Sequence, residues 1–331
     1  MPPHDSPTVL PNKWALWAEH SNVPGSLQDI LPGVSPDLAR RASRWFAEDE
    51  GERARIAREL VLASSGALKI VRTRGVGAFL HRPTSVLFHL VPGGTVAMGF
   101  DDEAWGALRE QYQFWDECDE AESVLQSREI RPRARVQVAP FLLGARPLSS
   151  EQLEAIAAGR PPGPGEGRAP PDLARVAKLP ADKYLEFLEA FGAGTFGEGE
   201  ILEFERALSG FGLRLPSEAE REHAARAGTS RLFPHGDAIP SSPNIGMNPF
   251  GFVDLGADAE VCADGWVPSL EGIPADGRPR VAPGAPRVVR GGAASCYPWQ
   301  GCAEWTLLLC AWRGPATAHD GFLTLRPAMS L

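Results

Sequence analysis

The chain has 331 residues, 43% of them hydrophobic, so it can bury a full core as one large domain with an appendage or as two domains. Its 35 glycines and 31 prolines predict many turns and irregular connections rather than long helices or a repeat array. The formal net charge of −9 argues against a general nucleic-acid-binding protein, because contact with phosphates requires a basic face.

The sequence also bears on location and cysteine chemistry. The first residues, MPPHDSPTVLPNKW, show no basic stretch followed by an apolar run, and no segment approaches the roughly 18 apolar residues of a membrane span. We therefore expect a cytoplasmic protein that does not enter a membrane. Its five cysteines are expected to be reduced and buried, and the lack of a C-x-x-C pair argues against structural zinc.

Residues 1–85 predict a small N-terminal α+β appendage. Apolar residues recur at helical spacing after Ser35 and predict two short helices broken near Gly51. The runs Leu68–Val71 and Ala78–His81 then predict a β-hairpin. Nothing in this segment indicates chemistry.

The next segments predict the start of a second domain. Residues 86–100, VLFHLVPGGTVAMGF, predict two strands joined by a Pro-Gly-Gly turn. Residues Asp101–Arg128 are acidic and predict an inserted helix, whose apolar stripe belongs to the core or to a cover over one face of the domain. Residues Gly159–Pro171 are too rich in proline and glycine to fold alone and predict a flexible loop within the domain.

The stretch Leu213–Gly228, LRLPSEAEREHAARAG, predicts a buried strand end that leads directly into a helix. Ser217 is expected to be the N-cap, and Glu220 stands three residues later to complete a capping box. Good helix formers follow, and Gly228 is expected to end the helix.

The residue order in this helix resembles that of the formylglycine-generating enzyme, or sulfatase-modifying factor, family. Two later segments carry the same resemblance: Asn248–Trp266, and the RVVRGG run Arg287–Gly292. The resemblance covers about residues 86–326. It implies an α+β fold, a C-type-lectin-like domain with much irregular structure, over residues 86–331.

In this family the Gly-Gly turn is followed by two cysteines that bind Cu(I) and the substrate thiolate, because soft thiolates select Cu(I). Here Cys296 stands at the matching distance from the Gly pair, whereas Cys302 lies one residue too far along the chain for the family spacing. The resemblance therefore implies one possible activity, a copper-dependent oxidase that converts a peptidyl cysteine to formylglycine. Against it, the serine after the turn is Ala293, and the family's arginine-rich stretch is replaced by apolar AEWTLLLCAWRG.

The family also implies a structural calcium ion, held partly by a Gly-Asn turn. The asparagine of that turn is Ala257 here, which removes one amide oxygen. Asp258, Glu260 and Asp264 remain as candidate calcium ligands.

Our leading interpretation is a noncatalytic family member that binds a protein or peptide partner through its C-terminal loop face. Exposed aromatic residues and arginine make good binding anchors. The candidate binding residues are Trp299, Trp305, Trp312 and Arg313. The alternative for the three tryptophans is that they belong to the buried core. Under this interpretation we expect no cofactor, no nucleic acid and no membrane partner, and the oligomeric state stays open. The copper-dependent oxidase is the alternative.

Overall fold

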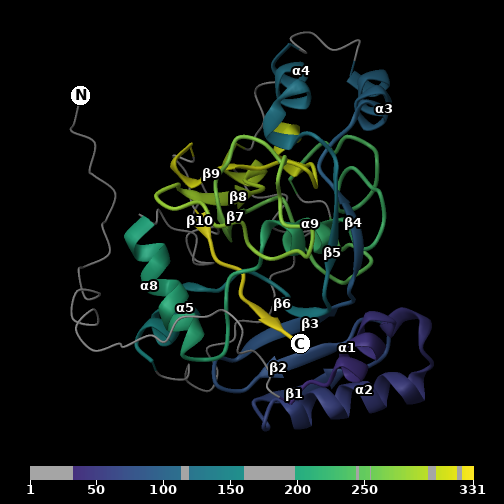
Figure 1. Ribbon diagram of the computed structural model, residues 1–331, viewed down its shortest axis with the longest axis vertical. Coiled ribbons are helices and arrows are strands. Elements are labelled where there is room, and N and C mark those ends of the chain that lie inside the picture. The colour runs from purple at the N-terminus through teal and green to yellow at the C-terminus, as the bar shows by residue number, and fades with distance from the viewer. Residues whose placement is uncertain are drawn as a thin grey trace.

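The computed structural model describes residues 33–112, 119–159, 198–243, 246–253, 255–296, 303–318 and 323–331 (Figure 1). Within these residues the strands form three sheets, and the helices lie around and between them. No helix of this part is long and apolar enough to cross a membrane. The expected loop Gly159–Pro171 lies outside the described residues beyond Gly159.

The largest sheet of the described residues is antiparallel and has the strand order β1-β2-β3-β6-β11. Its strands are β1 (Leu68–Arg72), β2 (Ala78–His81), β3 (Val86–Val91), β6 (Phe141–Gly144) and β11 (Ala328–Ser330). The helices α1 (Pro36–Ser43) and α2 (Glu50–Ala63) lie beside the β1 end of this sheet (Figure 1). The predicted hairpin Leu68–His81 is thus confirmed, and it extends a sheet that the rest of the chain also builds.

The N-terminal helices are fixed to this sheet by packing. Trp45, in the short 3₁₀ helix η2 (Trp45–Ala47), is fully buried and donates its indole N–H to the carbonyl of Gly75 at 2.6 Å. Phe46 stacks on Phe250, with ring centroids 5.5 Å apart. The break between the helices falls at residues 44–49 instead of near Gly51, because the side chain of Asp49 caps the first turn of α2.

The second half of the chain builds a smaller sheet, with the strand order β10-β7-β8-β9 in the described residues. Its strands are β7 (Ala259–Gly265), β8 (Arg287–Arg290), β9 (Gly314–Pro315) and β10 (Leu323–Thr324). A two-stranded sheet of β4 (Gly94–Met98) and β5 (Ala134–Val138) completes the set. Helix α9 (Glu218–Arg226) lies between these two sheets and contacts both of them.

The start of α9 forms as the sequence predicts. The hydroxyl of Ser217 accepts the backbone N–H of Glu220 at 3.1 Å, and the Glu220 carboxylate accepts the N–H of Ser217 at 2.8 Å. The helix ends at Arg226, and Ala227 follows as its C-cap in the left-handed conformation with φ +50°, before Gly228 with φ +73°.

The acidic insertion contains two helices, α3 (Asp102–Tyr112) and α4 (Asp119–Gln126), where the sequence predicts one. They stand at the top of the view, and α4 contacts the 3₁₀ helix η5 (Glu304–Leu308) (Figure 1). In the described residues the remaining helices are α5 (Ser150–Ala157), α8 (Glu198–Ser209) and the 3₁₀ segments η3 (Arg128–Ile130), η4 (Ala293–Cys296) and η6 (Ala316–Ala318).

Candidate functional site

Helix α9 is charged and yet fully buried, so each of its ionised side chains needs an internal partner. Glu218 accepts hydrogen bonds from Arg313 at 2.7 and 3.2 Å and from Arg290 at 3.4 Å. Glu222 accepts the Nε–H of Arg226 at 2.8 Å and lies 3.0 Å from a guanidinium nitrogen of Arg290. Glu218 and Glu222 are thereby neutralised by Arg290 of β8, by Arg313 next to β9 and by Arg226 of α9 itself.

Glu260 on β7 is the centre of a second buried cluster. Arg221 donates to one of its oxygens at 2.5 Å, and Arg326 donates to both oxygens at 3.0 and 2.7 Å. Burial alone would raise the pKa of this carboxyl group, but the two guanidinium groups hold the pKa below its ordinary value. Glu260 is therefore an ionised structural anion.

Asp264, at the other end of β7, binds two backbone groups. One oxygen accepts the N–H of Glu218 at 2.7 Å, and the other accepts the N–H of Arg280 at 2.7 Å. Burial and the nearby negative charge of Glu218 raise the pKa of Asp264 to about 7.

These contacts bear on the predicted calcium ligands. The oxygens of Glu260 face arginines, those of Asp264 face backbone N–H groups, and half-buried Asp258 lies just before β7. In the described part of the chain, no three histidine, cysteine, aspartate or glutamate side chains gather as metal ligands. The donors that the structure describes do not fit a calcium site.

The turn after β8 holds the first residues of the predicted copper motif. Gly291 has φ +84°, and a Cβ on it would lie 2.9 Å from the Cα of Gly256, so the turn requires glycine. The backbone of Cys296 ends η4 just beyond. The side chain of Cys296, and the whole of Cys302 and Trp299, lie outside what the structure describes.

The other cysteines that the structure describes, Cys262 and Cys310, are free and buried, as expected. Burial raises the pKa of the Cys310 thiol to about 12 and the pKa of Cys262 still further. Neither thiol is therefore ionised at neutral pH, and neither is a ready ligand for a soft metal ion.

The aromatic and arginine residues predicted for binding lie mostly in the interior. Trp305 is 2% exposed and packs on Tyr112 of α3 and on Phe233, with ring centroids 5.8 and 6.1 Å away. Arg313 is buried against Glu218 and also covers the ring of Trp266 at 4.4 Å, while Trp312 is half-buried. Trp305 and Arg313 thus support the interior instead of presenting an open surface.

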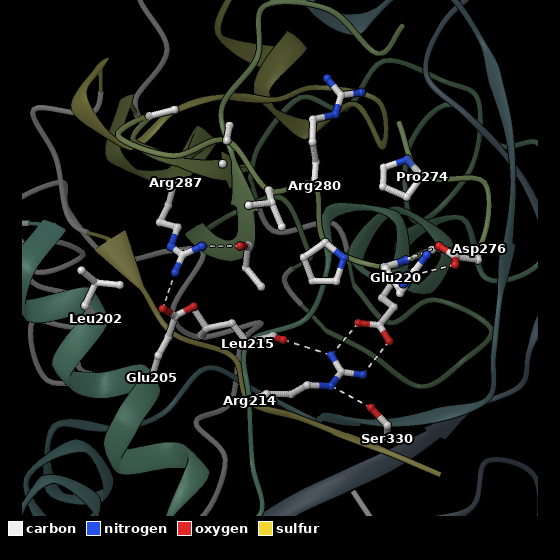
Figure 2. Close-up of a pocket in the computed structure, with 18 of the residues that line it drawn as sticks. Leu202, Glu205, Arg214, Leu215, Glu220, Pro274, Asp276, Arg280, Arg287 and Ser330 are labelled. Carbon is white, nitrogen blue, oxygen red and sulfur yellow. Dashed lines mark hydrogen bonds and ion pairs between the residues drawn. The ribbon is translucent and has the colours of Figure 1, made fainter. Parts of the chain in front are cut away.

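A groove of about 1180 Å³ opens on another part of the C-terminal half (Figure 2). One wall is α8, with Leu202 and Glu205, and the floor carries Arg214 and Glu220 at the start of α9. The opposite wall is the segment 274–286, which we call the groove loop. Sequence reasoning missed this groove because its two walls, α8 and the groove loop, are more than sixty residues apart in the sequence.

Most of the charges in the groove walls are paired. Arg214 grips Glu220 through two hydrogen bonds of 2.7 and 2.6 Å and also donates to the hydroxyl of Ser330 at 2.7 Å. Arg287 binds Glu205 and the carbonyl of Ala263 (Figure 2). Burial raises the pKa of Glu205 in spite of Arg287. Between these pairs the groove is lined mainly by apolar groups.

The groove loop is held in place by hydrogen bonds along its length. Its carbonyl oxygens at Ala275, Gly277, Arg280 and Pro286 accept hydrogen bonds of 2.7, 2.7, 2.9 and 2.7 Å from four residues outside it. Its tip is a tight turn in which the N–H of Ala285 donates to the carbonyl of Ala282 at 3.1 Å, with Pro283 and Gly284 (φ +74°) between them. The loop is therefore preorganised.

Comparison with known proteins gives one sequence family. The chain matches the sulfatase-modifying factor enzyme 1-like domain over residues 81–319. Its fold is similar to that of PvdO from Pseudomonas aeruginosa, at 19% identity and a TM-score of 0.47, over 75% of this chain and 95% of that chain. It is also similar to Treponema denticola variable protein 1, at 18% identity and a TM-score of 0.45, over 75% and 96% of the two chains. No curated protein matches the chain significantly in sequence.

Proposed function

The chain belongs to the sulfatase-modifying factor enzyme 1-like family, and we propose that it is a member that binds a protein or peptide partner and does not oxidise cysteine. The family match and the α9 scaffold fit the proposal, but they fit an enzyme equally well. The proposal therefore depends on the segments that depart from the family pattern.

The observation that carries the proposal is the position of the inserted helices. They cover the segment 303–312, where Trp305 is buried against Tyr112 and η5 contacts α4. The family's peptide groove is supported by the arginine-rich stretch that this apolar segment replaces. A substrate peptide would therefore have to displace α3 and α4, at the cost of exposing their apolar face.

The chemistry of the surrounding side chains supports the same proposal. A copper dithiolate requires ionised, accessible sulfur atoms. Cys310, on the covered segment, carries a buried thiol with a pKa raised to about 12. The carboxylates of Glu218 and Glu260 form ion pairs with Arg313 and Arg326, respectively.

Titration of the reduced full chain with Cu(I), against a chromophoric Cu(I) chelator, tests the noncatalytic half of the proposal. We expect no tight stoichiometric binding, and no oxidation of a cysteine-containing sulfatase peptide in the presence of oxygen. The alternative copper-dependent oxidase predicts one tightly bound Cu(I) that is lost in Cys296→Ser and in Cys302→Ser but retained in the control Cys118→Ser. That pattern would overturn the proposal.

A further inference from the structure

An exposed apolar side chain projects from the rigid groove loop. Val281 is 85% exposed, although the loop is anchored on both sides of it, at Arg280 and Pro286. Leu202, on the α8 wall of the same groove, is 40% exposed. Large apolar side chains presented at fixed positions beside a groove are typical of a binding surface, because little conformational entropy is lost when a partner covers them.

The backbone of Val281 is also open to a partner. Its N–H and C=O form no hydrogen bond with any other residue that the structure describes. Pro279 and Pro283 lie two residues to either side and have no N–H of their own. An extended peptide can form hydrogen bonds with both the N–H and the C=O of Val281, as in an antiparallel β-ladder. Because Pro279 and Pro283 cannot donate a hydrogen bond, they define the register of the peptide on the groove loop.

The charges of the groove favour an acidic partner. Four arginines line it against three carboxylates, and each carboxylate is paired with one of the arginines: Glu205 with Arg287, Glu220 with Arg214, and Asp276 with Arg278. The fourth, Arg280, is bonded through its side chain to the carbonyls of Ser269 and Leu270 and has no carboxylate partner among the described residues. The groove lining therefore carries one positive charge in excess, in a chain whose net charge is −9. That charge is on Arg280, which is 8% exposed and bonded to carbonyls that do not line the groove.

The size of the groove points to a peptide. At about 1180 Å³ it exceeds the roughly 300–1,000 Å³ of a small-molecule pocket. Its walls are also open and largely apolar, and they lack the convergent free polar groups that fix a small ligand.

We propose that the groove between α8 and the groove loop binds an extended segment of a partner protein, with apolar side chains against Val281 and Leu202 and an acidic residue beside Arg278. This inference rests on the proposed function and gives the partner a chemical class. Arg278 is exposed and bonded to exposed Asp276, so the partner's carboxylate can share its guanidinium group.

The test begins with selection of random dodecapeptides displayed on phage against the full chain. The best peptide is then synthesised, and its affinity for variants of the full chain is measured by fluorescence anisotropy. The groove variants are Val281→Ser and Arg278→Glu. The matched controls are Leu62→Ser, because Leu62 is 77% exposed on α2, and Arg55→Glu, because Arg55 is an exposed arginine of α2 with an acidic neighbour. All four positions are on the surface, so each variant should fold.

We expect the selected peptides to share an apolar core with an acidic flank. Each groove variant should weaken binding by at least about tenfold, while the controls leave it unchanged. Peptides whose affinity is the same in all four variants would overturn the groove assignment but leave the proposed function standing. A dimer of the wild-type chain that Val281→Ser dissociates would replace the peptide by a second copy of this chain. Absence of peptide binding together with tight Cu(I) binding at Cys296 and Cys302 would remove both proposals.

Discussion

Asp264 accepts a hydrogen bond from the backbone N–H of Glu218 at 2.7 Å, so a carboxyl group of β7 caps the first turn of α9. Its second oxygen accepts the N–H of Arg280 in the groove loop at 2.7 Å. One buried side chain therefore fixes both the helix that supports the ion pairs and the loop that forms a wall of the groove.

We predict that Asp264→Ala lowers the free energy of unfolding by about 2–5 kcal/mol, because two buried N–H groups lose their acceptor. Asp264→Asn should cost less, since its remaining carbonyl oxygen still accepts one of them. Urea denaturation measures both values. Asp102→Ala, which removes an exposed carboxylate of α3, is the control and should change stability by less than about 1 kcal/mol. Equal effects of Asp264→Ala and Asp102→Ala would contradict the capping role.

Removal of the charge at Glu260 should be severe. Glu260→Gln leaves Arg221 and Arg326 without a carboxylate in the interior, and we expect a loss of about 3–5 kcal/mol. Asp276→Asn breaks an exposed pair with Arg278 and should cost less than about 1 kcal/mol. Chemical denaturation of the two variants compares them directly, and similar costs would show that the Glu260 cluster does not depend on its charge.

Acid should destabilise the protein through its buried histidines. Burial lowers the pKa of His81 and of His89 from 6.5 to about 4. Between these values the two histidines bind protons in the unfolded chain but not in the folded chain, so their contribution to stability falls as the pH drops from about 6.5 to 4. His89→Leu should reduce this slope by about 1.4 kcal/mol per pH unit. Unfolding free energies measured across that range test the prediction, and an unchanged slope refutes it.

The inserted helices should control access to the segment 303–312. The side-chain amide of Gln111 donates to the carbonyl of Asp237 at 2.9 Å and accepts the N–H of Ile239 at 3.0 Å. In Gln111→Ala we expect faster hydrogen exchange in η5 with little change in β3, as mass spectrometry can resolve. Gln126→Ala is the control, because its amide bonds to Glu122 within α4. Unchanged exchange in η5 would show that α3 is held by other contacts.

Local patterns in the sequence predicted local structure well. The capping box of Ser217 and Glu220 and the hairpin Leu68–His81 depend on neighbours in sequence, and both are confirmed. The acidic insertion was harder to predict, because its periodicity does not indicate that α3 and α4 are separate helices.

The candidate site could not be predicted in the same way, because it depends on contacts between residues that are far apart in the sequence. From the sequence alone Glu260 is a candidate metal ligand. In the structure its oxygens accept hydrogen bonds from Arg221 and Arg326, which are 39 and 66 residues away in the sequence. From the sequence alone Trp305 fits a surface anchor and a core residue equally well. Its packing against Tyr112 of the insertion shows that it belongs to the core. The groove loop had a local signal in its proline-bounded turn, but no local pattern places α8 opposite that loop.

The glycine turn after β8 has a consequence for motif searches. At Gly291 a side chain would run into the carbonyl of Asp258 and the Cα of Gly256, so steric exclusion alone demands glycine at this position of the Arg-Gly-Gly run. A motif search that relies on this run selects for chains that form the turn, whether or not they bind copper. To separate oxidases from binding proteins, such a search has to weigh the residues beyond the turn and the presence of an insertion such as α3–α4.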